Sequence, residues 1–220
     1  MGKIPHTVVD LTQELSNDMP LYPGMAQPSF VDIAVVAKDG YGMSEWHLRN
    51  HIGTHVDAPT HLVEGDTLDD IPLERLVTEA VVLDFSQHAR GPLTRQELEP
   101  YLERIHPGDI VLIYSGGSRY WGSEQYWSGW CYPDAEAAQL LIDRQISAIG
   151  FDGPSADPVN LAEPENVFVD LHQLWLKSGV LLLENLTNLD RLPERTLLVV
   201  APIKVRGANG APSRIFALIS

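Results

Sequence analysis

The sequence predicts an α+β fold with mixed sheets, organised as a single domain over residues 1–220. Short apolar runs rich in β-branched residues outnumber the segments that show helical periodicity. The predicted strands and helices do not alternate regularly, which disfavours a doubly wound parallel sheet. Hydrophobic residues make up 44% of the 220 residues, and a chain of this length and composition can bury a sizeable core.

The expected strands are apolar or β-branched runs bounded by turn-forming residues. They cover residues 7–12, 29–38, 43–50, 79–85, 110–114, 146–151, 180–183, 196–202 and 214–219. The expected helices have recognisable starts and ends: Pro72 stands in the first turn of one, a Thr-Arg-Gln-Glu capping sequence opens another, and Gly179 follows the last. These helices cover residues 71–76, 94–104, 134–144 and 169–178.

Residues 51–61 concentrate side chains that bind divalent metals, namely His51, His55, Asp57 and His61. A straight strand would separate His51 from Asp57 by roughly 20 Å. A helix would bring the first two histidines together but turn Asp57 away from both. Gly53 gives the backbone freedom and Pro59 discourages helix before it. The segment therefore predicts an irregular, compact loop whose ligands converge on its concave side.

Two further candidates for metal ligands lie later in the chain. Glu184 follows the aliphatic run 180–183, and a charge in such surroundings is costly unless a cation pairs with it. The alternative is an exposed carboxylate at the end of a strand. His172 lies twelve residues before Glu184 on a predicted helix. A single histidine on a helix is weak evidence for a ligand without further support.

The composition restricts the expected binding partners and the expected cellular location of the protein. The chain has 15 Lys and Arg against 30 Asp and Glu, a net charge of −15, which disfavours binding to nucleic acid. Cys131 is the one cysteine, so no intrachain disulfide can form, and it is expected to be a packing residue. Residues 1–10 lack a signal-peptide pattern and no apolar run reaches about 18 residues. We expect a cytoplasmic protein with no membrane partner.

Two aromatic segments each have two possible roles. Leu21 and Tyr22 stand between Pro20 and Pro23, where they form either a wall of a substrate pocket or a packed surface loop. Residues 120–132 contain six Trp and Tyr residues. This segment is either a lid over a flat substrate or an oligomer contact, and the contact, or a mixture of both, is favoured slightly.

The pattern His-x-Gly-Thr-His-x-Asp-x-Pro-x-His resembles the signature of the cyclase family of metal-dependent hydrolases, which includes bacterial kynurenine formamidase and isatin hydrolase. Residues 19–24, 149–155, 172 and 184–186 also match, so the resemblance covers nearly the whole chain. It implies that His51, His55 and Asp57 bind a first metal. It also implies that His172 and Glu184 complete a second position bridged by Asp57, and that His61 transfers protons. His61 as a direct ligand remains an alternative.

The resemblance further implies a swivelling β/β/α arrangement and a homodimer or homotetramer. The expected reaction is attack of metal-activated water on a small aromatic amide, with N-formylkynurenine yielding kynurenine and formate as the leading substrate. Opening of a cyclic amide or lactone is the alternative reaction. Zn²⁺ is the expected ion and Mn²⁺ the alternative, with one or two ions per subunit. A non-catalytic metal-binding module is the alternative from another class, and it would require saturated coordination and no adjacent pocket.

The expected substrate-binding residues are Leu21, Tyr22 and Pro23. Residues 21–25 read Leu-Tyr-Pro-Gly-Met, whereas the expectation for formamidases is Val-Trp-Pro-Gly-Asp. This departure affects the predicted substrate most directly. The chain has neither the Gly-rich phosphate loop of P-loop proteins nor a Gly-x-Ser-x-Gly nucleophile motif, so activated water is the simplest nucleophile.

Overall fold

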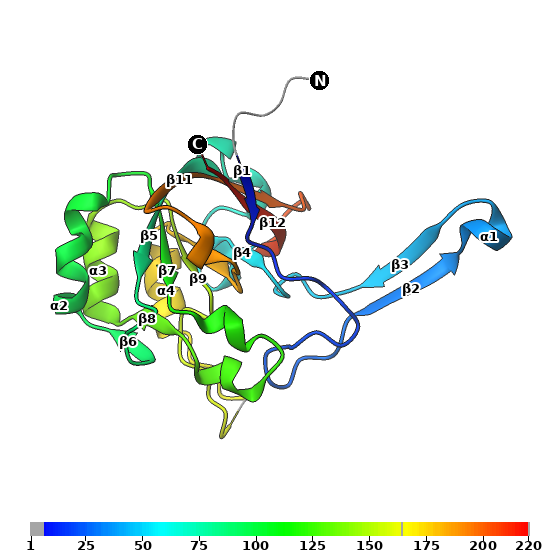
Figure 1. Ribbon diagram of the computed structural model, residues 1–220, viewed down its shortest axis with the longest axis horizontal. Coiled ribbons are helices and arrows are strands. Elements are labelled where there is room, and N and C mark those ends of the chain that lie inside the picture. The colour runs from blue at the N-terminus through cyan, green and yellow to red at the C-terminus, as the bar shows by residue number, and fades with distance from the viewer. Residues whose placement is uncertain (1–6, 164, 220) are drawn as a thin grey trace.

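The central feature of the computed structural model is a closed, barrel-like sheet, shown in Figure 1, and the structure describes residues 7–163 and 165–219. Its strands are β4 (His55–Asp57), β5 (Val77–Asp84), β7 (Ile110–Tyr114), β9 (Ala148–Phe151), β10 (Leu181–Glu184), β11 (Arg195–Pro202) and β12 (Gly210–Ile219). They follow the order β12-β11-β5-β7-β9-β10-β4, and β4 pairs again with β12 to close the ring. Strand β1 (Thr7–Asp10) flanks β12.

The sheet is mixed, as the sequence predicts. Strands β5, β7, β9 and β10 run parallel to one another, whereas the pairings of β11 with β5 and β12, and of β4 with β10 and β12, are antiparallel. Alternate residues of each buried strand face opposite sides: Ile110 and Leu112 belong to one apolar cluster, and Val111 and Ile113 belong to another. The first cluster takes residues from all seven ring strands and therefore fills the interior of the barrel.

The second cluster lies between the outside of the barrel and helices α2 (Arg95–Leu98), α3 (Ala135–Asp143) and α4 (Asp170–Lys177). Helix α3 begins at Asp134, whose side chain accepts a hydrogen bond from the amide of Ala137. Helix α4 contributes the fully buried Trp175. Burial of this face anchors α4 against the barrel, and α4 in turn carries His172.

Residues 29–47 form a projecting hairpin, here called the arm. It consists of β2 (Ser29–Ala34), a four-residue helix α1 (Val36–Asp39) and β3 (Met43–His47). Figure 1 shows the arm extending well away from the barrel. The predicted strand over residues 29–38 is therefore wrong beyond Ala34, because the chain turns there. The Asp39 carboxylate accepts a hydrogen bond from the amide of Val35, and Gly40 ends the turn at a positive φ of 76°.

Other elements differ from prediction for local reasons. The predicted helix 94–104 divides into α2 and a 3₁₀ helix, η4 (Glu99–Arg104), because Pro100 has no amide hydrogen to continue the α-helical pattern. The predicted helix 71–76 is a single 3₁₀ turn, η3 (Leu73–Arg75). A small parallel pair was not predicted, and it joins β6 (Gly91–Leu93) to β8 (Cys131–Pro133). The remaining 3₁₀ turns are η1 (Pro59–His61), η2 (Leu68–Asp70), η5 (Gly117–Tyr120), η6 (Glu124–Ser128) and η7 (Leu189–Arg191).

Among the helices in the described ranges, none has both the length and the apolar character that a bilayer crossing requires. Residues 1–6, which contribute to the prediction about a signal peptide, lie outside the described residues.

Candidate metal centre and substrate pocket

Strand β4 brings the central donors together. His55 and Asp57 are two residues apart on this strand, so their side chains face the same side. The antiparallel register with β10 places Glu184 opposite His55. The His55 Nε2 atom lies 3.2 Å from Asp57 Oδ1 and 3.5 Å from Glu184 Oε2. The predicted irregular loop is thus only partly right, because residues 55–57 form a short strand that pairs on both edges.

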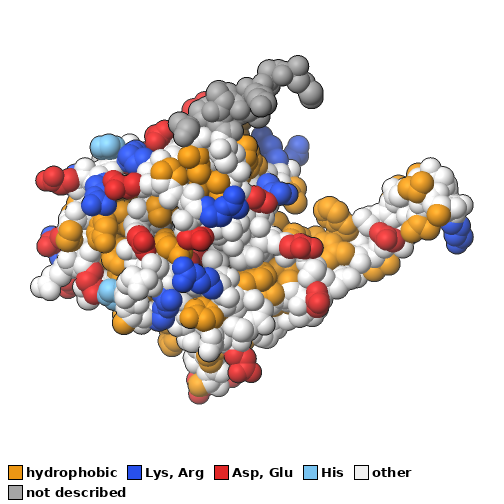
Figure 2. Space-filling model, in the orientation of Figure 1, with side chains coloured by type: hydrophobic (Ala, Val, Ile, Leu, Met, Phe, Trp, Pro, Cys, Tyr) orange, Lys and Arg blue, Asp and Glu red, His pale blue; other side chains and the backbone are white. Residues whose placement is uncertain are grey.

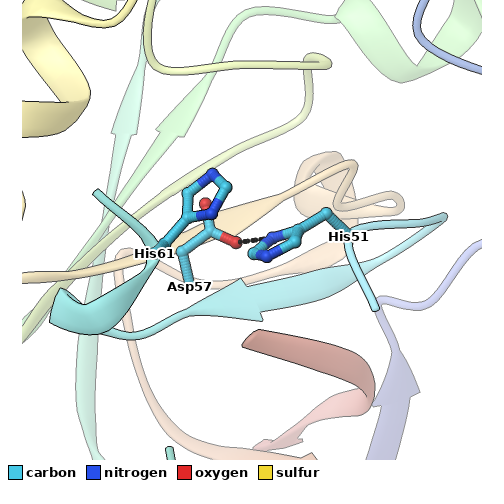
Figure 3. A group of neighbouring side chains, drawn as sticks. All are labelled: His51, Asp57 and His61. Atoms are coloured by element: carbon cyan, nitrogen blue, oxygen red, sulfur yellow. Dashed lines mark hydrogen bonds and ion pairs between the residues drawn. The ribbon is translucent and has the colours of Figure 1, made fainter. Parts of the chain in front are cut away.

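His51 reaches Asp57 from the loop that precedes β4, as Figure 3 shows. Its Nδ1 atom lies 2.6 Å from Asp57 Oδ1. On the other side, the ring of His51 stacks on that of His61 with a centroid distance of 3.9 Å. His61 ends η1, the 3₁₀ turn that Pro59 begins. The loop and the turn therefore place two imidazoles beside one carboxylate.

A buried hydrogen-bond network fixes the loop that carries these donors. The Gly53 carbonyl accepts hydrogen bonds from Asn185 Nδ2 at 2.9 Å and from His55 Nδ1 at 2.9 Å. The Tyr126 hydroxyl donates to Asn185 Oδ1 at 2.7 Å, and the Thr54 hydroxyl donates to the Asn185 carbonyl at 2.6 Å. With Nδ1 of His55 donating to a carbonyl, its Nε2 is free to bind a metal.

His172 enters the site from helix α4. Its Nε2 atom lies 3.1 Å from Glu184 Oε1 and 3.9 Å from Asp57 Oδ2. The other ring nitrogen, Nδ1, lies 2.6 Å from Asp157 Oδ2. The Asp157 carboxylate also accepts hydrogen bonds from the amides of Leu171 and His172. Asp157 therefore both orients the imidazole and satisfies the amides at the start of the helix.

The donors fall into two groups that share Asp57. One contains His51, Asp57 and His61, and the other contains His55, Asp57 and Glu184, with donor atoms in each group within 4.8 Å of one another. Both His51 and His55 lie nearest Asp57 Oδ1, whereas His172 lies nearest Oδ2, and the predicted division of the ligands between two metal positions stays a prediction. His172 lies outside both groups but next to Glu184. Because Asp57 belongs to both groups, it lies where a carboxylate that bridges two metal ions would lie.

The charge balance of the site tests whether these residues suit a metal. Asp57 and Glu184 are buried, and within the described residues neither forms an ion pair with Lys or Arg. Burial by itself lowers the pKa of His55, but the Asp57 and Glu184 carboxylates and the Gly53 carbonyl together outweigh it and raise that pKa to about 9. Burial opposes the charged form of His172 too, yet hydrogen bonds with Asp157 and Glu184 raise its pKa to about 10.

These pKa shifts show that the buried site attracts positive charge. A divalent cation would supply that charge to the same carboxylates, and imidazole and carboxylate together suit Zn²⁺ and Mn²⁺. The donor set therefore fits a divalent metal, and the protein has a candidate metal-binding site.

A cavity of about 240 Å³ lies directly against these donors. Its polar wall includes His51, His55, Asp57, His61, His172 and Glu184. The rest of its lining is mainly apolar and aromatic, with Leu21, Tyr22, Met25, Leu62, Trp121, Trp127, Val167 and Phe168. An apolar cavity with a few convergent polar groups is typical of a binding site for a small molecule.

The two aromatic segments both contribute to this cavity. Leu21 and Tyr22 line it, whereas Pro23 lies in a neighbouring hollow. The Tyr22 ring meets Trp127 edge to face with a centroid distance of 6.2 Å. In segment 120–132, Trp121 and Trp127 line the cavity, while Tyr126 and Trp130 are buried. The role of this segment as a pocket wall is thus observed, and its role as an oligomer contact stays a prediction.

Several residues that support the site were not singled out from the sequence. Asp157 lies between the predicted strand 146–151 and the predicted helix 169–178, and an acidic residue ahead of a histidine-bearing helix is a usable signal for an orienting partner. Tyr126 was counted only as one of several aromatic residues. Asn209 Oδ1 lies 3.1 Å from His51 Nε2 across the barrel closure, and no local sequence pattern indicates this contact.

Comparison with known proteins identifies the family and supports the fold. The model of the Cyclase family, described as "Putative cyclase", matches residues 9–158. The chain therefore belongs to the Cyclase family. It is 28% identical over 211 residues to a kynurenine formamidase from Salinibacter ruber, covering 94% of this chain and 95% of that protein. It is 30% identical to a kynurenine formamidase from Erythrobacter litoralis, covering 92% and 89%.

Solved structures with a similar fold include isatin hydrolases and other metal-dependent hydrolases. Isatin hydrolase A from Labrenzia aggregata, bound to benzyl benzoate, aligns with a TM-score of 0.85 at 28% identity, covering 97% of this chain and 93% of that one. A potential metal-dependent hydrolase with cyclase activity aligns with a TM-score of 0.79 at 27% identity, covering 97% and 98%.

Proposed function

We propose that this protein is a metal-dependent hydrolase that cleaves the C–N bond of a small aromatic amide, with N-formylkynurenine as the leading substrate and kynurenine and formate as products. One observation carries the proposal: the Asp57-centred donors form the polar wall of a cavity that is otherwise apolar and aromatic. Kynurenine formamidases that match along nearly the whole chain support the choice of substrate.

The metal would be held by His51, His55, Asp57, His172 and Glu184, with Zn²⁺ preferred and Mn²⁺ as the alternative. When bound, a divalent cation supplies Lewis acidity that lowers the pKa of water and polarises a carbonyl group. The two oxygens of Asp57 face different partners, since Oδ1 is near His51 and His55 and Oδ2 is near His172. With its two oxygens near different histidines, Asp57 could bind one ion or bridge two.

His61 is the proposed proton carrier. Burial lowers the pKa of its imidazole from the ordinary value, which favours the neutral ring. A neutral imidazole can accept a proton and return it to the leaving amine. His61 lines the cavity and stacks on His51, which holds its ring at the cavity wall. Its place in the donor group with Asp57 keeps direct ligation as the alternative role.

The aromatic wall orients the substrate. Tyr22, Trp121, Trp127 and Phe168 surround the cavity and would pack against an aryl ring, leaving the amide against the histidines. The same side chains exclude water from the apolar end of the pocket.

Opening of a cyclic amide, as in isatin, is the second candidate. The similarity to isatin hydrolase A favours it, because that structure aligns with a TM-score of 0.85. A non-catalytic metal-binding module is less consistent with the site, since the donors adjoin a cavity that a substrate can fill.

Hydrolysis assays with defined metal content test the proposal. Wild-type protein loaded with Zn²⁺ or Mn²⁺ should hydrolyse N-formylkynurenine or isatin in preference to simple lactones, and Asp57→Ala should remove the activity. Asp143→Ala, which changes an exposed carboxylate of α3, is the matched control and should behave as wild type. Activity that survives in Asp57→Ala would contradict the assignment.

Other expectations also stand as proposals. We propose a cytoplasmic location, a homodimer or homotetramer, and the swivelling β/β/α description of the fold. The net charge of −15 supports a protein that does not bind nucleic acid.

A further inference from the structure

Tyr126 lies between the aromatic wall of the cavity and the loop that carries the metal-binding candidates. Its side chain is fully buried, and its ring meets those of Trp121 and Trp127 edge to face, with centroid distances of 5.1 Å and 5.4 Å. Both tryptophans line the cavity, whereas Tyr126 is not part of the lining. Tyr126 therefore supports the aromatic wall from behind, and its hydroxyl group has a partner elsewhere.

That partner is the side-chain amide of Asn185. The Tyr126 hydroxyl donates to Asn185 Oδ1 at 2.7 Å, and Asn185 Nδ2 donates to the Gly53 carbonyl at 2.9 Å. Asn185 directly follows Glu184, the last residue of β10, and it has a positive φ of 58°, which asparagine tolerates better than most residues. Its side chain therefore links the end of β10 to the loop that precedes β4.

The chemistry of the groups fixes the direction of each hydrogen bond. A carbonyl oxygen can only accept, so the nitrogen of the Asn185 amide must face Gly53 and its oxygen must face Tyr126. For the same reason, the His55 Nδ1 atom, which lies 2.9 Å from the Gly53 carbonyl, carries a proton. The other nitrogen of that ring, Nε2, lies 3.2 Å from Asp57 Oδ1. One carbonyl thus holds both the amide and the imidazole in a single orientation.

Removing the hydroxyl group would disturb this arrangement from its far end. Among the described residues, Tyr126 is the one donor to Asn185 Oδ1, so a buried acceptor would lose its partner. If the amide then rotated by half a turn, its oxygen would face the Gly53 oxygen and the hydrogen bond between them would break. In both cases the carbonyl that orients His55 would be held less firmly.

We propose that Tyr126 is a positioning residue for the metal site. Its hydroxyl group fixes the Asn185 amide, and the amide fixes the Gly53 carbonyl. The carbonyl in turn keeps a proton on Nδ1 of His55 and leaves Nε2 directed at the metal position. Because the Tyr126 ring also supports the two tryptophans of the aromatic wall, one side chain anchors both the wall and the metal-binding loop. This role rests on the proposed function, since it requires His55 to be a metal ligand.

Zn²⁺ affinity, measured by competition with a chromogenic chelator, tests this role in a double-mutant cycle. Tyr126→Phe keeps the ring and removes the hydroxyl group, and it should weaken Zn²⁺ binding about tenfold, the lower end of the range for groups that orient a metal-bound histidine. Asn185→Gly allows the positive φ, removes the amide and should weaken binding at least as much. In the Asn185→Gly background, Tyr126→Phe should have no further effect. Additive losses would overturn the proposal that the hydroxyl acts through the amide.

Tyr114→Phe is the matched control. Tyr114 is also buried, and its hydroxyl accepts a hydrogen bond from Arg119, outside the network of Asn185. Tyr114→Phe should therefore bind Zn²⁺ as wild type does. An equal loss of affinity in Tyr114→Phe and Tyr126→Phe would refute a specific role for Tyr126.

The metal-free protein allows a test that needs neither metal nor hydrolysis. Proton–nitrogen correlation spectra of the histidine rings, assigned with His55→Gln, should show a slowly exchanging Nδ1 proton of His55 in wild type and in Tyr114→Phe. In Tyr126→Phe this signal should be lost through faster exchange with water. An unchanged signal in Tyr126→Phe would overturn the positioning role alone, whereas wild-type protein that binds no Zn²⁺ would refute the proposed function itself.

Discussion

Replacing Asp157 by Ala should separate the orientation of a metal ligand from the capping of a helix. Its carboxylate accepts hydrogen bonds from His172 Nδ1 at 2.6 Å and from the amides of Leu171 and His172 at 2.9 Å. Losing the amide contacts should cost about 1 kcal/mol of stability, as for other helix caps. Losing the imidazole partner should weaken metal binding about 10- to 100-fold, or roughly 1.4–2.7 kcal/mol.

Asp134→Ala is the matched control, because Asp134 caps α3 through the amide of Ala137 and has no role in the metal site. Competition with a chromogenic chelator measures metal affinity, and urea unfolding of the metal-free proteins measures stability. We expect both variants to lose similar stability, and only Asp157→Ala to lose metal affinity. Equal metal affinity in the two variants would refute the orienting role of Asp157.

Three further predictions concern packing, metal and pH. Gly210→Ala should weaken metal binding at least tenfold in the chelator assay, because a Cβ atom there would lie 2.4 Å from His51 Cε1. Removing the metal with EDTA should lower the thermal unfolding temperature, since a ligand present at 100 times its Kd stabilises the folded state by about 2.7 kcal/mol. Hydrogen bonds from Thr94 and His88 lower the pKa of Glu97 from 4.5 to about 2, so the stability that Glu97 contributes should be complete above pH 4.5 and decline towards pH 2. Urea unfolding of wild type and Glu97→Gln should show a difference that is larger at pH 6 than at pH 3.

The controls for these predictions lie in the same chain. Gly42→Ala adds a Cβ atom in ordinary contact distance of one side chain and should leave metal affinity unchanged. EDTA should not lower the thermal unfolding temperature of Asp57→Ala. A decrease equal to that of wild type would mean that EDTA does not act through the proposed metal site. A stability difference for Glu97→Gln that grows as the pH falls would contradict the direction of its pKa shift.

The sequence predicts the donors of the site better than their arrangement. His51, His55, Asp57 and His61 lie within eleven residues, so a bend within this one segment is enough to bring them together. Their division into two groups depends on β10 and β12, which pair with β4 from more than 100 residues away. Local pattern contains no information about such pairing, and the expected loop was therefore not resolved into a strand.

The arm shows a second limit of sequence pattern. Alternation of apolar and polar residues normally indicates that one face of a strand is buried. In the arm, Val31 and Ile33 alternate in this way but are both more than half exposed in the single chain. The alternation predicts the two strands but does not predict their exposure, and Figure 2 shows hydrophobic side chains along the projecting arm. The strands themselves were predicted, but their separation from the barrel was not.

Closure of the barrel and assembly of the metal site depend on the same three residues. Strand β4 is only three residues long, yet it is the element that joins β10 to β12. Two of its three side chains, His55 and Asp57, are metal-binding candidates, and the third, Val56, is fully buried in the barrel interior. So short a strand contributes few backbone hydrogen bonds, and two buried polar side chains weaken it further without a cation. A metal that binds His55, Asp57 and Glu184 would join β4 to β10 directly, so metal binding and the closed barrel should stabilise one another.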